Sequence, residues 1–162
     1  MNKKIINQVS IRNFVFGAED SLVSTVGLLS GVAIAGVATS TIVLTGIILI
    51  FVEAFSMGVG SYLSEYITHS EKDPQRKMSQ LAGVVMLISY MVAGFIPLSP
   101  YIFFEGTLAL ILSISFSLVA LIILGIIGSN LSHTNRLKNT VRMFILGGGA
   151  IVIGIVVSMF LQ

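Results

Sequence analysis

Long apolar stretches alternate with short polar linkers along the whole chain. A helix needs about 20 apolar residues to cross the hydrocarbon core of a bilayer. Five stretches approach or exceed that length, and we predict transmembrane helices at about 14–38, 41–66, 81–98, 106–129 and 143–161. No linker could hold a soluble domain, so residues 1–162 are expected to form a single transmembrane domain. The predicted fold class is an all-α polytopic membrane protein with five transmembrane helices.

The ends of the predicted helices are set by turn residues. Thr39 and Ser40 leave only a tight turn between the first two helices, which should therefore form an antiparallel hairpin. Pro97 and Pro100 are expected to end the third helix, because a residue that precedes proline disfavours the helical conformation.

Small and hydroxylated residues recur inside the predicted spans. Gly27 and Gly31 form a Gly-x-x-x-Gly pair, and the glycines of residues 147–154 thin one side of the fifth helix. Such stripes allow close helix packing in lipid, either within one subunit or at a subunit interface. Ser113 and Ser117, one turn apart, are expected to bond backbone carbonyls or a neighbouring helix.

The composition agrees with burial in a bilayer. Hydrophobic residues make up 55% of the chain and charged residues 10%, whereas a soluble domain carries roughly a quarter charged residues. The absence of cysteine excludes disulfides and thiolate metal sites. The first apolar stretch, interrupted by Arg12, Glu19 and Asp20, is expected to remain as a helix rather than to be cleaved as a signal peptide.

The basic residues predict the orientation of the helices. Five crossings would place all of them on one side of the membrane, and basic loops face the cytoplasm. The N-terminus is therefore expected in the cytoplasm and the C-terminus on the opposite side. Three clusters contain all nine basic residues: Lys3, Lys4 and Arg12; Lys72, Arg76 and Lys77; Arg136, Lys138 and Arg142.

Acidic residues fall within or at the edge of the first two predicted helices. A carboxylate at the centre of a bilayer costs about 2.5–3.5 kcal/mol on insertion scales. No Lys, Arg or His lies within a predicted span to pair with these acids. They therefore indicate proton binding, metal binding or both. The four residues are Glu19, Asp20, Glu53 and Glu65.

The acids form a predicted ladder across the membrane. Glu53 falls near the middle of the second helix, with Met57 one turn nearer the cytoplasm on the same face. Asp20 should lie roughly level with residues 57–60, and Glu65 should lie at the cytoplasmic mouth or be a solvated helix end. Carboxylates with a thioether suit Fe²⁺ or another first-row metal better than Mg²⁺ or Ca²⁺. The predicted metal ligands are Asp20, Glu53, Met57 and Glu65.

Two neighbours of these ligands affect the space around them. Glu19 is about 100° around the helix from Asp20, so the two side chains should not face one cavity equally well. Gly58 and Gly60 leave room beside Met57 for another helix or for a hydrated ion.

Several other functions lack sequence support. The chain has no Walker-type phosphate loop, no His-Glu-x-x-His pattern and no nucleophile elbow. An enzyme is therefore the least favoured class. The basic clusters indicate topology and contact with anionic lipid headgroups, and we expect no nucleic-acid partner.

Four segments resemble the vacuolar iron transporter family. Residues 16–31 read FGAEDSLVSTVGLLSG, which is similar to the family's first-helix signature F-G-x-x-D-G-L-V-T-x-x-G-L-x-x-G. Residues 53–64 resemble its second-helix signature, with an acid, then Ser-Met-Gly, then Tyr-Leu. Residues 97–101 and 136–147 are similar to its turn between helices three and four and to the start of its fifth helix. The resemblance covers nearly the whole chain.

The resemblance implies a five-helix fold, a homodimer and a metal path at the dimer interface. Family members move Fe²⁺, and often Mn²⁺, out of the cytoplasm in exchange for protons. By this match Asp20, Glu53 and Met57 take the transport-site roles. No cofactor is expected, because the metal ion is the transported substrate.

The chain departs from the family pattern in three places. Studied iron transporters often carry a helical cytoplasmic extension with acidic metal ligands between helices two and three, which residues 67–80 are too few to form. Ser61 stands where many relatives have an acid, and Ser21 replaces a glycine. The short linker offers only His69, Glu71 and Asp73.

Three functions remain open from the sequence. The first is an exporter of Fe²⁺ or Mn²⁺ that works by proton antiport. The second is a non-transporting membrane scaffold or accessory subunit, which the missing extension motivates. The third is a proton-coupled carrier of another cation. The compact chain, without a targeting segment, suits a prokaryotic plasma membrane.

Overall fold

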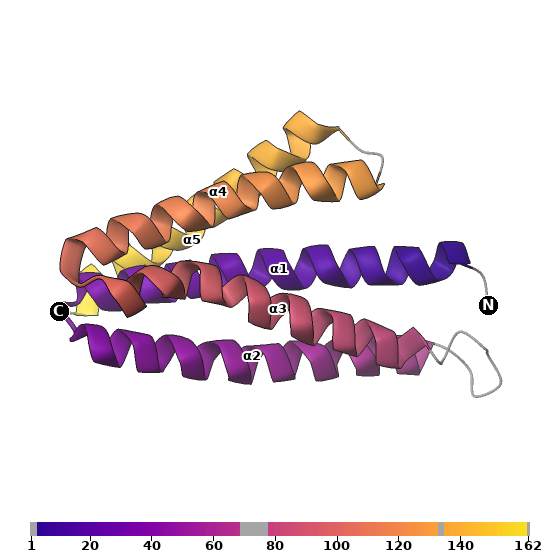
Figure 1. Cartoon of the computed structure of the whole chain (residues 1–162), viewed down its shortest axis with the longest axis horizontal. Helices are drawn as coiled ribbons and strands as arrows, with labels where there is room; N and C mark the ends of the chain where they lie inside the picture. The colour runs from indigo at the N-terminus through magenta and orange to yellow at the C-terminus, as the bar shows by residue number, and fades with distance from the viewer. Residues whose placement is uncertain (1–2, 69–77, 133–134, 162) are drawn as a thin grey trace.

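The computed structural model describes residues 3–68, 78–132 and 135–161, and they form a bundle of five helices (Figure 1). All five run roughly along the long axis of the molecule, and successive helices run in opposite directions. The predicted all-α, five-helix fold class is confirmed. The helices are α1 (Lys3–Ile34), α2 (Thr39–Thr68), α3 (Met78–Phe103), α4 (Gly106–Ser132) and α5 (Arg136–Leu161).

The outer surface of the bundle is apolar. Phe55, Phe103 and Phe160 are 67%, 77% and 85% exposed, and soluble monomers rarely expose large apolar side chains so widely. Four helices, α2 to α5, are long and apolar enough to cross a membrane. The remaining long helix, α1, contains more of the described buried polar residues than any other helix and makes its most extensive contacts with α3 and α5. Neighbouring helices, rather than lipid, therefore surround much of it.

Two helices begin earlier than the apolar pattern predicts. The first helix begins at Lys3 rather than near residue 14, and α5 begins at Arg136 rather than near residue 143. Apolar length marks only the hydrocarbon core, whereas a helix continues into the headgroup region while its polar side chains remain solvated. Arg12 therefore lies inside α1, although it precedes the apolar stretch predicted from residue 14.

The connection between α1 and α2 also differs from the prediction. The turn comprises residues 35–38, and α2 already begins at Thr39, so Thr39 and Ser40 do not form the turn. Gly36 has a φ of 74°, a left-handed conformation that glycine adopts at little cost after a helix end. The two helices are antiparallel, as expected, and α3 packs extensively along both of them.

The prediction that Pro97 and Pro100 end the third helix was wrong, because α3 continues through both to Phe103. A proline within a helix removes one backbone donor and leaves the carbonyl four residues earlier without its usual partner. For Pro100 that carbonyl belongs to Ile96, and the Ser99 hydroxyl donates to it at 2.9 Å. Neighbouring hydroxyls can satisfy such carbonyls within a membrane, so the prolines remain inside α3.

Hydroxyls of α4 also bond backbone carbonyls, as predicted. The Ser113 hydroxyl donates to the Pro97 carbonyl of α3 at 2.7 Å, and the Ser117 hydroxyl donates to the Ser113 carbonyl at 2.7 Å. Both serines are fully buried. The first of these bonds ties α4 to the proline-containing part of α3.

The glycine stripes bring α1 and α5 into backbone contact. A Cβ placed on Gly31 would lie 2.6 Å from the carbonyl oxygen of Gly154, and a Cβ on Gly154 would collide with the carbonyl oxygen of Gly27. Of the two explanations that the sequence leaves open, these residues therefore support packing within one subunit.

Candidate functional site

Two polar contacts join α1 to α2 near the end of the bundle where the N-terminus lies. The guanidinium of Arg12 forms an ion pair with the carboxylate of Glu65. On the next residue of α1, the Asn13 side-chain oxygen accepts a hydrogen bond from the Ser61 hydroxyl at 2.5 Å. We call this pair of contacts the polar clasp. No basic residue lies within a predicted span, but Arg12 precedes the first of these spans and is the partner of Glu65.

A cavity of about 820 Å³ lies beside the polar clasp. We call it the α1–α2 cavity, because all but one of its lining residues come from those two helices. A Cβ on Gly60 would meet nothing within 4 Å, whereas one on Gly58 would meet the backbone and side chains of α3. Gly60 thus leaves open space and Gly58 admits a neighbouring helix. The lining residues are Arg12, Asn13, Phe16, Met57, Gly60, Ser61, Ser64, Glu65, Thr68 and Met86.

The polar clasp also relates the level of the acids on α1 to those on α2. Along antiparallel helices, Asp20 lies eight residues beyond Arg12 and is level with a residue eight before Glu65, which is Met57. Counted from the Asn13–Ser61 contact, Asp20 is level with Ala54. The predicted ladder had Asp20 level with residues 57–60, which agrees with the first count and is about one turn from the second.

Asp20 and Glu53 are close enough for their charges to interact electrostatically. Glu53 occupies the middle of the 30-residue α2, and both carboxyl side chains are partly buried. Two negative charges that repel each other in a region of low dielectric constant favour a proton or a cation between them.

Tyr90 and Ser24 extend this polar group. Tyr90 of α3 is fully buried, and its hydroxyl lies 2.8 Å from the Ser24 hydroxyl of α1. The carbonyl of Tyr90 accepts a hydrogen bond from the hydroxyl of Ser21, the residue that follows Asp20 on α1. The apolar pattern gives no signal for this tyrosine, because a tyrosine within an apolar helix has the same pattern as a core residue.

Asp20 also lines a second cavity, of about 580 Å³, between α1 and α5. Glu19 lines the same cavity. Arg142 of α5 is a third lining residue and attracts Glu19 electrostatically. Glu19 is therefore an acid with a basic neighbour, unlike Glu53.

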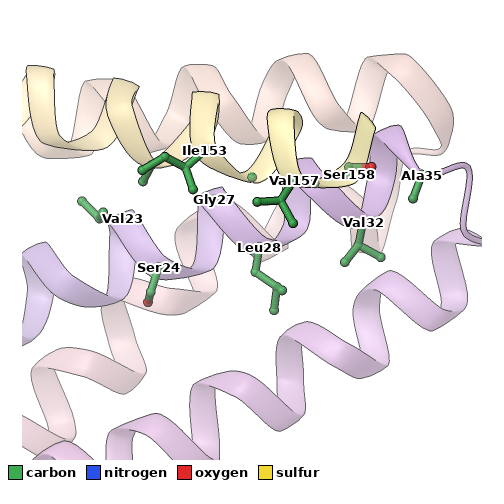
Figure 2. Close-up of a pocket in the computed structure, with 12 residues that line it drawn as sticks. Val23, Ser24, Gly27, Leu28, Val32, Ala35, Ile153, Val157 and Ser158 are labelled. Carbon is green, nitrogen blue, oxygen red and sulfur yellow. The ribbon is translucent and has the colours of Figure 1, made fainter. Parts of the chain in front are cut away.

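An apolar groove of about 560 Å³ continues along α1 and α5 from this cavity (Figure 2). Val23 and Ile153 line both, and Ser24 lies at the end of the groove nearest Asp20. Gly27 lies at the bottom, where the two helices touch. Apart from its two serines the groove has no polar side chain, so it offers no metal ligands.

The structure thus divides the predicted metal ligands between two places. Met57 and Glu65 line the α1–α2 cavity, while Asp20 and Glu53 interact near the middle of the bundle. Within the described ranges, no three His, Asp or Glu residues lie close enough together to hold a metal ion. The linker residues His69, Glu71 and Asp73 lie outside those ranges.

An apolar helical bundle with interacting carboxylates at half its depth is a polytopic membrane protein with the features of an ion-handling protein. The model of the VIT family matches residues 11–81 and 65–159, which together cover most of the chain. The chain therefore belongs to the VIT family. It is also 29% identical over 75 residues to vacuolar iron transporter 1 of Tulipa gesneriana. That alignment covers 46% of this chain and 30% of the relative.

Proposed function

We propose that this chain transports a divalent metal ion, Fe²⁺ or Mn²⁺, out of the cytoplasm in exchange for protons. The observation that carries the proposal is the interaction between Asp20 and Glu53 at half the depth of the bundle. The matched family and the name of the Tulipa relative support metal as the cargo.

The two acids would alternate between metal and protons. Ionised carboxylates bind the divalent ion, and the same groups take up protons when the metal leaves, because two adjacent negative charges are unfavourable in low dielectric surroundings. Met57, one turn from Glu53, adds a thioether that favours Fe²⁺ and other softer ions over Mg²⁺ and Ca²⁺.

A homodimer would complete the metal site. Two carboxylates and one thioether are few ligands for a first-row ion, and the described part of one subunit holds no cluster of three His, Asp or Glu. A second subunit would double each ligand. The outer face of α2 is apolar, with Phe55 67% exposed, and could pack against either lipid or a second copy of the chain.

The test is metal uptake into liposomes with an acidic interior. Wild-type protein should admit Fe²⁺ or Mn²⁺ with proton efflux, and Glu53→Gln should reduce the initial rate at least about tenfold, since it removes a charge that binds the ion. Glu105→Gln is the matched control, because Glu105 is an exposed acid outside the helices and its variant should retain the wild-type rate.

Three results would contradict the proposal. Equal rates for Glu53→Gln and wild type would remove Glu53 from the transport path. No flux of either ion through folded wild-type protein would favour the accessory-subunit function, and flux of a different cation in a competition panel would favour the third candidate.

A further inference from the structure

The Arg12–Glu65 ion pair joins an exposed group to a buried one. The Arg12 side chain is 64% exposed, whereas the Glu65 side chain is 11% exposed. A carboxylate that is nearly buried needs a positive partner or strong hydrogen bonds to remain ionised. Arg12 can supply that charge from the edge of the α1–α2 cavity. Because its side chain is mostly exposed, tight packing does not hold the guanidinium in this position.

Arg12 is paired with the carboxylate of Glu65, which lines the same cavity as Met57. A divalent cation entering this cavity from the N-terminal end would meet Glu65 before Met57, which lies eight residues or about 12 Å deeper along α2. The guanidinium therefore occupies the place where an incoming cation would bind its first carboxylate ligand, Glu65.

The structure also offers a place for the displaced side chain. Arg12 lines a second cavity, of about 480 Å³, formed by α1, α4 and α5. Glu19 lines that cavity two turns further along α1. A long arginine side chain can thus leave Glu65 and remain in contact with polar surroundings that include another carboxylate.

We infer that Arg12 is an internal competitor for cations at Glu65, and that an incoming divalent ion must displace its guanidinium to enter the α1–α2 cavity. The inference rests on the proposed function for its purpose, but it concerns binding at Glu65 and not passage through the membrane. The Asn13–Ser61 hydrogen bond holds α1 and α2 together while the arginine moves, because both of its residues are one position or one turn from the ion pair.

The test measures Mn²⁺ binding by the purified full chain, with free Mn²⁺ followed by electron paramagnetic resonance. Arg12→Gln should lower the Mn²⁺ dissociation constant about two- to fivefold, the range expected when a partly exposed ion pair no longer competes. Arg12→Lys retains the charge and should stay nearer to wild type. Arg136→Gln is the matched control, because it removes one exposed positive charge from the same end of the bundle without touching Glu65.

The double variant Arg12→Gln/Glu65→Gln separates a specific effect from a general change of charge. It should lose the gain in affinity and bind Mn²⁺ no more tightly than Glu65→Gln alone. Arg12→Gln binding Mn²⁺ no more tightly than Arg136→Gln does would overturn the inference, and so would a gain in affinity that persists in the double variant.

Liposome uptake distinguishes this inference from the proposed function. If wild type transports no metal but Arg12→Gln still binds Mn²⁺ more tightly through Glu65, the inference stands and the transport proposal fails. If wild type transports metal and Arg12→Gln leaves both binding and the half-saturating concentration unchanged, the inference alone fails.

Discussion

Tyr90 is tied to the part of α1 that carries Asp20. Its hydroxyl is within hydrogen-bond distance of Ser24, one turn from Asp20, and its carbonyl accepts a hydrogen bond from Ser21. A buried hydroxyl in a hydrogen-bonded network can fix the position of the polar groups near it. We therefore expect Tyr90 to position Asp20 for the proposed transport.

Tyr90→Phe tests this role at one atom. The variant removes a hydrogen bond worth about 1 kcal/mol of unfolding free energy and leaves the ring in place. We expect the half-saturating metal concentration for transport to rise severalfold while the protein remains folded. Tyr101→Phe is the control, because Tyr101 lies on the same helix about three turns away and its variant should transport like wild type. Equal half-saturating concentrations for both variants would remove Tyr90 from the site.

The mid-depth acids could be predicted from the sequence, whereas their partners could not. Glu53 stands out because any carboxylate within an apolar stretch is costly. The Arg12–Glu65 pair depends on the relative depth of α1 and α2, and on α1 extending beyond its apolar part. Neither property appears in hydropathy. Tyr90 has no signal of its own, because only the folded bundle brings it beside Asp20.

At the scale of helices, the third helix shows where local rules fail. Proline disfavours helix continuation by removing a donor, and that argument predicted an end at residues 97–100. That rule leaves out the Ser99 hydroxyl, which donates to the Ile96 carbonyl that Pro100 leaves without its usual partner. The apolar pattern therefore predicted that this helix exists, but not where it ends.

The contact between α1 and α5 gives a prediction about stability. Gly154→Ala should lower the free energy of unfolding by about 1–3 kcal/mol, the usual cost of overpacking, because its Cβ would strike the Gly27 carbonyl. Gly148→Ala is the control on the same helix, where an added Cβ meets nothing within 4 Å. There the better helix propensity of alanine should leave stability equal or slightly higher.

Thermal unfolding in detergent measures both variants. A melting temperature for Gly154→Ala at or above that of Gly148→Ala would show that α1 and α5 can move apart without loss of stability. The glycine stripe would then be better explained as a subunit interface.

At the scale of the whole molecule, the distribution of charge defines a direction. The described basic residues all belong to the end of the bundle where the N-terminus lies (Figure 1); they are Lys3, Lys4, Arg12, Arg136, Lys138 and Arg142. The opposite end, with the α1–α2 turn and the start of α4, contains no Lys or Arg. Basic segments remain in the cytoplasm, so the α1–α2 cavity, which includes Arg12, is expected to face the cytoplasm.

Single cysteines can test this orientation directly, because the chain has none of its own. Asn135→Cys marks the basic end and Thr107→Cys the opposite end, and both positions are exposed. A membrane-impermeant maleimide added outside intact cells should label Thr107→Cys and leave Asn135→Cys unlabelled until the cells are lysed. The reverse pattern would place the cavity of Met57 and Glu65 outside. Cations would then meet Glu65 from the external side, and the same cavity would serve uptake rather than export.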